Sequence, residues 1–359
     1  MTTDELYMAR CIQLARNGEI YAAPNPMVGA VIVCDGRIIG EGYHARCGEP
    51  HAEVNAFGRV KDESLLARST LYVSLEPCAH YGRTPPCAEL IVRKGVRRVV
   101  VGCVDPFAKV QGRGIEIIRR AGIEVEVGVL ERECRELNRR FFTAQTQQRP
   151  YITLKWAQTA DGIMGVKDSV HPGRRLLISN KQTSRRAHYL RATHSSILVG
   201  YNTALFDNPS LTTRLVDGPD PLRVVFDPRG ALPSGLRLFD GTVPTLVAGY
   251  VETSLLKGRP NVDFLKLSED QNPYRQILAE LHSRNIQSLL VEGGRAVLQS
   301  FIDLNLFDEI HVEQSAREFR PADFGPTAVA VEAPSLNRAP DSSEELGDSR
   351  ILHFSCQTI

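Results

Sequence analysis

The first part of the chain alternates between helix-type and strand-type spacing of its apolar residues. An amphipathic helix is predicted by the spacing of Leu6, Ala9, Ile12, Leu14 and Ala15. Apolar residues at 28–33 and 38–39 flank an Asp35-Gly36 turn, which predicts a hairpin. Further strands are expected at 70–75, 99–101 and 123–127, with helices starting near 51–54 and 85–87 and at 114–121. This order predicts a mixed sheet covered by helices.

A second alternating region follows the polar segment 146–149 and Pro150, which disfavours helix in the residue before it. Asn180 is predicted to cap a helix that runs to about Ala192, and a second helix is expected to include 277–281. Predicted strands lie at 151–155, 197–200, 222–226, 245–248 and 288–291, the last running through Gly293-Gly294 into another helix. We therefore expect two α/β domains, 1–147 and 148–359.

Composition narrows the class of protein. A chain of 359 residues is long for one core, and its 42% hydrophobic and 24% charged residues are ordinary for a water-soluble protein. A net charge of +1 gives no electrostatic case for a nucleic-acid partner. No apolar run approaches the ~20 residues of a membrane span, and the acidic N-terminus is unlike a signal peptide. Cysteines without a paired framework suit a reducing cytoplasm.

The segment from His51 to Cys87 carries the clearest chemistry. His51-x-Glu53 and Pro77-Cys78 match the zinc deaminase signature, in which a glutamate that is not a ligand moves the protons. Zinc with three protein ligands keeps a position for water and lowers the pKa of that water. The signature would place the second cysteine three residues after Cys78, but Tyr81 stands there and Cys87 is the next cysteine.

Packing roles or a structural zinc site could also explain these residues. A lone histidine or cysteine is usually a packing residue. A structural zinc site would require four protein ligands, and no fourth cysteine or histidine has a partner spacing. In the second region, Gly293-Gly294 between a strand and a helix could let backbone N–H groups approach a phosphate, although a tight turn is the commoner explanation of such a pair.

Longer motifs make the chain resemble the bifunctional riboflavin-biosynthesis deaminase/reductases, the RibD family, over nearly its whole length. The first half carries PNPMVG at 24–29, GYH at 42–44, GEPHAE at 48–53 and LEPCAHYGRTPPC at 75–87. The second half carries LKxAxTxDG at 154–162, VGxNT at 199–203, DNPxLTxR at 207–214 and VEGG at 291–294. The resemblance implies a cytidine-deaminase-like α/β/α domain followed by a dihydrofolate-reductase-like α/β domain, and a homo-oligomer.

For the first domain, the resemblance implies hydrolytic loss of the 2-amino group of 2,5-diamino-6-ribosylamino-4(3H)-pyrimidinone 5′-phosphate. His51, Cys78 and Cys87 would hold Zn²⁺, and Glu53 would carry the protons. Polar residues on matched motifs could hold the pyrimidine or its phosphate: Asn25, His44, His80 and Arg83. Asn25 could equally serve its turn.

For the second domain, the resemblance implies hydride transfer from NADPH to C1′ of the opened ribosyl unit, giving 5-amino-6-ribitylaminouracil 5′-phosphate. The residues implied for the cofactor are Ala157, Thr203, Asp207, Gly294, Arg295 and Ala296. The residues implied for the substrate are Lys155, Arg191, Leu211, Arg214 and Glu292, with the arginines near its phosphate. Lys155 and Glu292 are candidates for proton handling.

Three other hypotheses about the function compete with that of a bifunctional enzyme. Segments 171–179 and 314–320 differ from the family pattern, so an active deaminase with a scaffold-only reductase domain is the alternative. A nucleic-acid-editing deaminase would need a basic, aromatic face, but aromatic residues are only 7% of the chain. Glu53 argues against a non-catalytic zinc protein, because a structural site has no use for that carboxylate.

Overall fold

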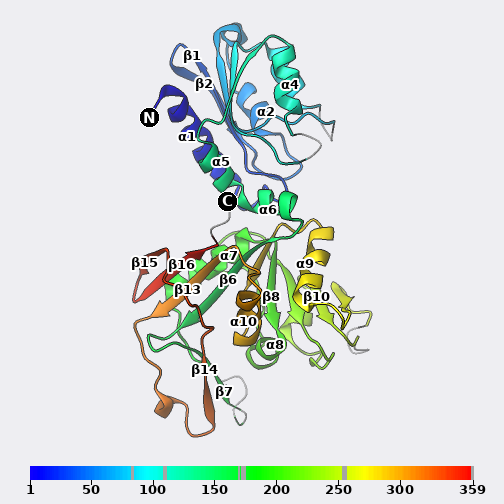
Figure 1. The fold of residues 1–359 in the computed structure, drawn as a ribbon, viewed down its shortest axis with the longest axis vertical. Helices are drawn as coiled ribbons and strands as arrows, with labels where there is room; N and C mark the ends of the chain where they lie inside the picture. The colour runs from blue at the N-terminus through cyan, green and yellow to red at the C-terminus, as the bar shows by residue number, and fades with distance from the viewer. Residues whose placement is uncertain (82–84, 108–110, 169, 171–174, 253–256, 357–359) are drawn as a thin grey trace. The chain divides into compact units, whose positions relative to one another are not determined.

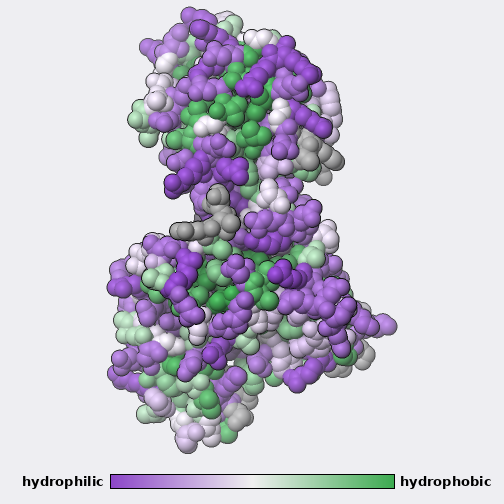
Figure 2. Space-filling view, in the orientation of Figure 1, coloured by the Kyte–Doolittle hydropathy of each residue, from purple (hydrophilic) through white to green (hydrophobic). Residues whose placement is uncertain are grey.

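The computed structural model of the protein describes residues 1–81, 85–107, 111–168, 170, 175–252 and 257–356. The chain forms two compact units, Met1–Gln148 and Arg149–Ile359, each built on its own large sheet (Figure 1). Hydrophilic residues dominate the visible surface of both units, with apolar residues showing between them (Figure 2). Among the described residues, no helix has the length and apolar character that crossing a membrane requires.

The first unit has a five-stranded sheet in the order β2-β1-β3-β4-β5. Its strands are β1 Gly29–Cys34, β2 Arg37–Tyr43, β3 Thr70–Leu75, β4 Arg98–Cys103 and β5 Glu124–Val127. β1 is antiparallel to β2 and β3, whereas β3, β4 and β5 are parallel. The predicted hairpin and the mixed sheet are thus both confirmed.

Helices cover both faces of this sheet. They are α1 Thr3–Ala15, α2 Ala52–Phe57, α3 Cys87–Lys94, α4 Arg113–Arg120, α5 Glu131–Leu137 and α6 Arg139–Gln147. Because strand side chains alternate between faces, Ile32 and Val73 pack with α2, α3 and α4, while Val31 and Tyr72 pack with α1, α5 and α6. The result is a three-layer α/β/α unit.

The second unit has a nine-stranded sheet in the order β11-β10-β9-β8-β12-β6-β13-β16-β15. These strands are β6 Tyr151–Gln158, β8 Ser196–Gly200, β9 Leu222–Phe226, β10 Thr245–Gly249, β11 Val262–Lys266, β12 Ser288–Val291, β13 Glu309–Ser315, β15 Ser342–Leu346 and β16 Ser349–Ser355. In this spatial order, every strand from β11 through β13 runs parallel to its neighbours. At the other end of the sheet, β16 is antiparallel to β13, and β15 is antiparallel to β16.

The helices of the second unit are α7 Lys181–Thr193, α8 Tyr201–Asp207, α9 Pro273–Ser283 and α10 Arg295–Asp303. α9 and α10 pack on one face of the sheet, and α7 and α8 on the other. Asn180 caps α7 as predicted, because its side-chain oxygen accepts hydrogen bonds from the N–H groups of Gln182 and Thr183 at 2.8 and 2.9 Å.

A separate two-stranded ribbon projects from the second unit (Figure 1). It pairs β7 Ile163–Asp168 with β14 Ala328–Glu332 in antiparallel register. This ribbon was not predicted, because its two strands are more than 150 residues apart in the chain and few of their residues are buried.

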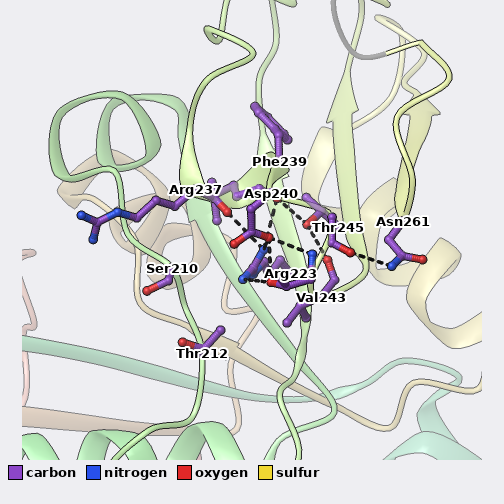
Figure 3. A network of polar contacts seen from close by, with 12 residues as sticks. Ser210, Thr212, Arg223, Arg237, Phe239, Asp240, Val243, Thr245 and Asn261 are labelled. Carbon is purple, nitrogen blue, oxygen red and sulfur yellow. Dashed lines mark hydrogen bonds and ion pairs between the residues drawn. The ribbon is translucent and has the colours of Figure 1, made fainter.

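Arg223 on β9 anchors a long loop in this unit (Figure 3). Its side chain has no exposed surface, and one guanidinium nitrogen lies 3.0 Å from a carboxylate oxygen of Asp240. The same nitrogen donates to the carbonyl oxygens of Arg237 and Leu238, both at 3.3 Å. A buried charge is stable only when it is paired in this way. The same loop is tied to the segment after α8, because the backbone N–H of Arg237 donates to the Oδ1 of Asn208 at 2.8 Å.

Candidate metal centre and ligand cavity

Three donor atoms in the first unit lie close enough together to hold one metal ion. The Nδ1 of His51 is 3.3 Å from the Sγ of Cys87 and 3.6 Å from the Sγ of Cys78, and all three atoms lie within 4.8 Å of one another. Tetrahedral zinc with ordinary Zn–N and Zn–S bonds separates such atoms by about 3.6 Å. The spacing therefore fits zinc with three protein ligands.

Each donor stands where a regular element begins or ends. His51 is the N-cap of α2, Cys78 follows β3, and Cys87 is the first residue of α3. The metal site thus lies at strand-to-helix junctions, as predicted. The helix expected to start near 85–87 begins at Cys87, with Pro86 as its N-cap.

Glu76 fixes the segment that carries Cys78. Its buried carboxylate accepts hydrogen bonds from the N–H groups of Gly112 and Gly114 at 2.9 and 3.0 Å, at the start of α4. The positive end of that helix favours the carboxylate. Close packing of α4 against the carbonyl of Pro77 then requires glycine at 114, because a Cβ there would lie 1.9 Å from that oxygen.

The two thiols are arranged so that one of them, Cys78, carries a negative charge. The pKa of Cys78 is lowered to about 4, first by a hydrogen bond from Cys87 and then by the His51 ring and the backbone N–H of Cys87. The pKa of Cys87 rises in turn, because it shares that hydrogen bond with Cys78. The pKa of His51 rises mainly through its hydrogen bond to Cys78. One thiolate is therefore favoured even before a metal binds.

Glu53 lies on the first turn of α2, two residues after His51, and is 3% exposed. Burial, followed by the negative charge of Cys78, raises its pKa to about 7. A carboxyl group with a pKa near neutrality can both accept and release a proton at physiological pH.

The predicted pyrimidine-binding residues fall into three groups. The Nδ2 of Asn25 lies 3.1 Å from the Nε2 of His44, and the His44 ring stands edge-on to His51 with centroids 5.5 Å apart. Burial lowers the pKa of His44, which favours its neutral ring. His80 is exposed and touches Phe107 edge-on. Arg83 lies outside the described residues.

Asp105 is a candidate site residue that the sequence reasoning missed. It follows β4, is 7% exposed, and has a pKa raised to about 6 by burial and by the nearby charges of Glu76 and Cys78. No spacing rule connects it to the His-x-Glu motif, and only the parallel pairing of β3 with β4 brings it near Cys78.

A cavity of about 1200 Å³ lies in the second unit. It is bounded by the ends of β6 and β8, by α8, by the start of α10 and by the β7–β14 ribbon. The predicted residues that line it are Lys155, Ala157, Arg191, Thr203, Asp207, Leu211, Glu292, Gly294, Arg295 and Ala296. It thus brings together the residues expected for a cofactor and for a substrate.

Arg214 is not among the residues that line this cavity. Its guanidinium instead donates hydrogen bonds to Ser210 and Thr212, and its backbone N–H donates to the Nδ1 of His188. Burial and the neighbouring positive charge of Arg191 both lower the pKa of Arg214. Arg175 belongs to the segment 171–179 that departs from the family pattern; it lines the cavity, and its charge acts on the partly buried carboxyl of Asp207.

The paired glycines permit close packing at the cavity floor. A Cβ on Gly293 would lie 2.4 Å from the Cα of Val199, so only glycine fits beside β8. Gly294 has a φ of +67° and precedes α10, and a Cβ there would lie 2.9 Å from the Oγ1 of Thr203. The pair is therefore required for packing and also places the N-terminus of α10 at the cavity.

A buried ion pair stands on the cavity wall. Arg191 donates two hydrogen bonds to Glu292, at 3.1 Å from Nε and 2.6 Å from Nη2. Burial alone would raise the pKa of Glu292, but the charge and hydrogen bonds of Arg191 hold it below its usual value. This fork-to-carboxylate pairing fixes both side chains in place.

Two family descriptions match the chain. Residues 1–103 match the cytidine and deoxycytidylate deaminase zinc-binding region, and residues 150–315 match the RibD C-terminal domain. The riboflavin biosynthesis protein RibD of Aquifex aeolicus is 40% identical over 354 residues, 98% of each chain. That of Escherichia coli is 35% identical over 324 residues, 86% of each chain.

Solved structures agree over the same length. The structure of Acinetobacter baumannii RibD has a TM-score of 0.84 with 32% identity and covers 98% of each chain. A diaminohydroxyphosphoribosylaminopyrimidine deaminase/5-amino-6-(5-phosphoribosylamino)uracil reductase from Thermotoga maritima has a TM-score of 0.83 with 35% identity. It covers 98% of this chain and 99% of its own.

The fold, the metal centre and these matches define a bifunctional enzyme in which a zinc-binding deaminase domain precedes a reductase domain. The predicted fold class is confirmed. The chain belongs to the RibD family of riboflavin-biosynthesis deaminase/reductases. The family match over the second half does not favour the alternative of a scaffold-only reductase domain.

Proposed function

We propose that the first domain removes the 2-amino group of 2,5-diamino-6-ribosylamino-4(3H)-pyrimidinone 5′-phosphate with one water, releasing ammonia. The observation that carries this proposal is the spacing of the His51, Cys78 and Cys87 donor atoms with buried Glu53 beside them. Zinc held by these three residues would supply a water of lowered pKa.

Glu53 would move the protons of this reaction. Its carboxylate takes a proton from the attacking water and delivers it to the ring nitrogen, and a second proton reaches the departing amine by the same route. A pKa of about 7 suits both directions of transfer. Neutral His44 and Asn25 would orient the pyrimidine at the edge of the metal centre.

The second domain would reduce the deaminated product with NADPH. NADPH would supply the hydride for C1′ of the ring-opened ribosylamino group, and a proton would complete the ribitylamino product. The Gly294 turn and the N-terminus of α10 would hold the cofactor, with Thr203 and Asp207 opposite. Arg191 and Leu211 would contact the substrate, and Lys155, which lines the same cavity, would donate the proton.

Substitution of Glu53 by Gln tests the first assignment. The variant keeps the shape of the side chain and leaves the three donor atoms intact, so zinc content is expected to stay near one per chain while ammonia release is abolished. Reduction of already deaminated substrate serves as the control for folding of the other domain. Ammonia release at the wild-type rate by E53Q would refute the mechanism.

A coupled assay tests the pair of activities. Purified, zinc-loaded protein receives the diaminopyrimidine first without and then with NADPH. Ammonia release followed by an equal amount of NADPH oxidation is expected. Release of ammonia without NADPH oxidation would leave only the deaminase assignment standing.

We also propose that the protein forms a homo-oligomer and works in a reducing cytoplasm, where its metal-binding thiols stay reduced.

A further inference from the structure

A buried carboxylate stands behind the cavity wall of the second unit. Glu313 on β13 is 1% exposed, yet its Oε1 has no hydrogen-bond partner among the described residues. Its Oε2 accepts a hydrogen bond from the Oγ of Ser179 at 2.7 Å and lies 3.8 Å from the Nζ of Lys155. Both partners line the cavity, whereas Glu313 itself does not.

The sheet register explains why Glu313 and Lys155 meet. β6 and β13 are parallel neighbours, and Glu313 pairs with Ala157 while His311 pairs with Lys155. Paired residues of neighbouring strands point to the same face, and residues two apart on one strand do so too. The carboxylate of Glu313 and the ammonium of Lys155 therefore lie on the same face of the sheet, on neighbouring strands and two register positions apart.

The charges around Lys155 leave Glu313 as its counter-ion. The other carboxylate near Lys155 is Glu292, whose two oxygens are already occupied by the guanidinium of Arg191. A buried carboxylate is stable only when it is paired, so Glu313 in turn depends on Lys155 and Ser179. Lys155 thus lines the cavity while its ammonium lies beside a carboxylate that does not line it.

We propose that Glu313 is a positioning residue of the reductase, which holds the ammonium of Lys155 in place and ties Ser179 to the same point. The inference rests on the proposed reductase function. In that reaction the hydride brings two electrons to C1′, the π pair of the C1′=N bond moves to nitrogen, and Lys155 gives that nitrogen a proton. Glu313 touches neither substrate nor cofactor, and solvent returns the proton to Lys155.

The expected effect of Glu313→Gln is a loss in kcat of the reductase. Gln keeps the size of the side chain and its contact with Ser179 but removes the charge that holds Lys155. A misplaced reacting group lowers rate by about 10–100-fold, and we expect a fall in that range with the KM for NADPH unchanged. Ammonia release, which depends on the other domain, should match the wild type.

A double-mutant cycle separates positioning from a general structural role. In a Lys155→Met background, Glu313→Gln should lower kcat by less than about 2-fold, because there is no ammonium left to position. Ser179→Ala, which keeps the charge, is the matched control and should lower kcat less than Glu313→Gln does. A full, additive loss in the Lys155→Met background would overturn the inference.

Stability provides a second measurement if a single variant folds poorly. Lys155→Met leaves the carboxylate of Glu313 buried without a cation, so its denaturation midpoint should fall, and adding Glu313→Gln should recover part of that loss. No recovery would contradict the pairing. Wild-type protein is assayed in parallel: if it does not oxidise NADPH, the proposed reductase function fails, whereas an active wild type with a fully active Glu313→Gln variant refutes only this inference.

Discussion

The Cα of Gly114 lies so close to the carbonyl of Pro77 that a Cβ at position 114 would stand 1.9 Å from the carbonyl oxygen. Pro77 immediately precedes Cys78, a proposed zinc ligand, and the N–H of Gly114 also binds the carboxylate of Glu76. The start of α4 and the metal-binding segment are thereby packed as one piece.

Gly114→Ala is expected to weaken zinc binding and ammonia release together. Overpacking of this kind costs about 1–3 kcal/mol or forces the backbone to move, and movement of Pro77 would displace Cys78. Zinc content after dialysis, measured by elemental analysis, and ammonia release are the readouts. Gly235→Ala, at a position with open space, is the control. A G114A protein with full zinc content and activity would show that the segment can relax without loss.

Removal of zinc is expected to silence one activity and spare the other. All three donor residues belong to the first unit, whereas the residues that line the large cavity all belong to the second. After treatment with a chelator, ammonia release should disappear, while NADPH oxidation with deaminated substrate should remain near its starting rate. Parallel loss of both activities would mean that the second unit depends on the metal.

Arg191→Met is expected to destabilise the protein more than removal of the whole ion pair does. The substitution leaves the buried carboxylate of Glu292 without its partner, at a cost of about 3–5 kcal/mol. The double variant R191M/E292Q should recover a large part of that loss, although the reductase stays inactive. Urea unfolding of the wild type, R191M, E292Q and R191M/E292Q measures the coupling. Equal destabilisation of R191M and the double variant would argue against a strong pair.

Stability should fall as pH drops from about 6.5 towards 4, because of His188. Burial, helped by the charges of Arg191 and Arg214, lowers its pKa to about 4, and its Nδ1 accepts a hydrogen bond from the backbone N–H of Arg214. The unfolded chain binds a proton at its ordinary pKa of about 6.5, whereas the folded chain does not, so the neutral ring contributes stability above that pH. The loss should be about 1–3 kcal/mol.

His188→Asn is the matching variant, because its side-chain oxygen can accept the same hydrogen bond without titrating. Its unfolding free energy should change less between pH 7.5 and pH 4.5 than that of the wild type. An unchanged pH dependence would assign the acid sensitivity to other groups.

The sequence predicted the parts of the fold that local chemistry determines. The cap at Asn180 and the buried strand at 197–200 were found because a capping side chain and a continuous apolar run leave clear patterns. The β7–β14 ribbon was missed, because its pairing joins distant segments and few of its residues are buried. The β15–β16 hairpin was missed too, because β15 has no buried residue and β16 has only a partial pattern of buried positions.

The same distinction holds for the sites. His51, Glu53 and Cys78 follow from the spacing of the deaminase signature, whereas Cys87 departs from that spacing and was identified through the family resemblance. Asp105 and Glu313 are ordinary acidic residues in the sequence, and only their burial beside Cys78 and Lys155 makes them stand out.

The late position of β14 in the chain has a consequence for synthesis on the ribosome. Residues 329–332 form part of the cavity wall of the second unit, so that wall cannot be complete until residue 332 has been made. The donor residues of the metal centre, by contrast, all precede residue 88, within a unit that ends at Gln148. Since domains fold as units during translation, a nascent chain is expected to acquire its zinc centre well before it can bind the nicotinamide cofactor.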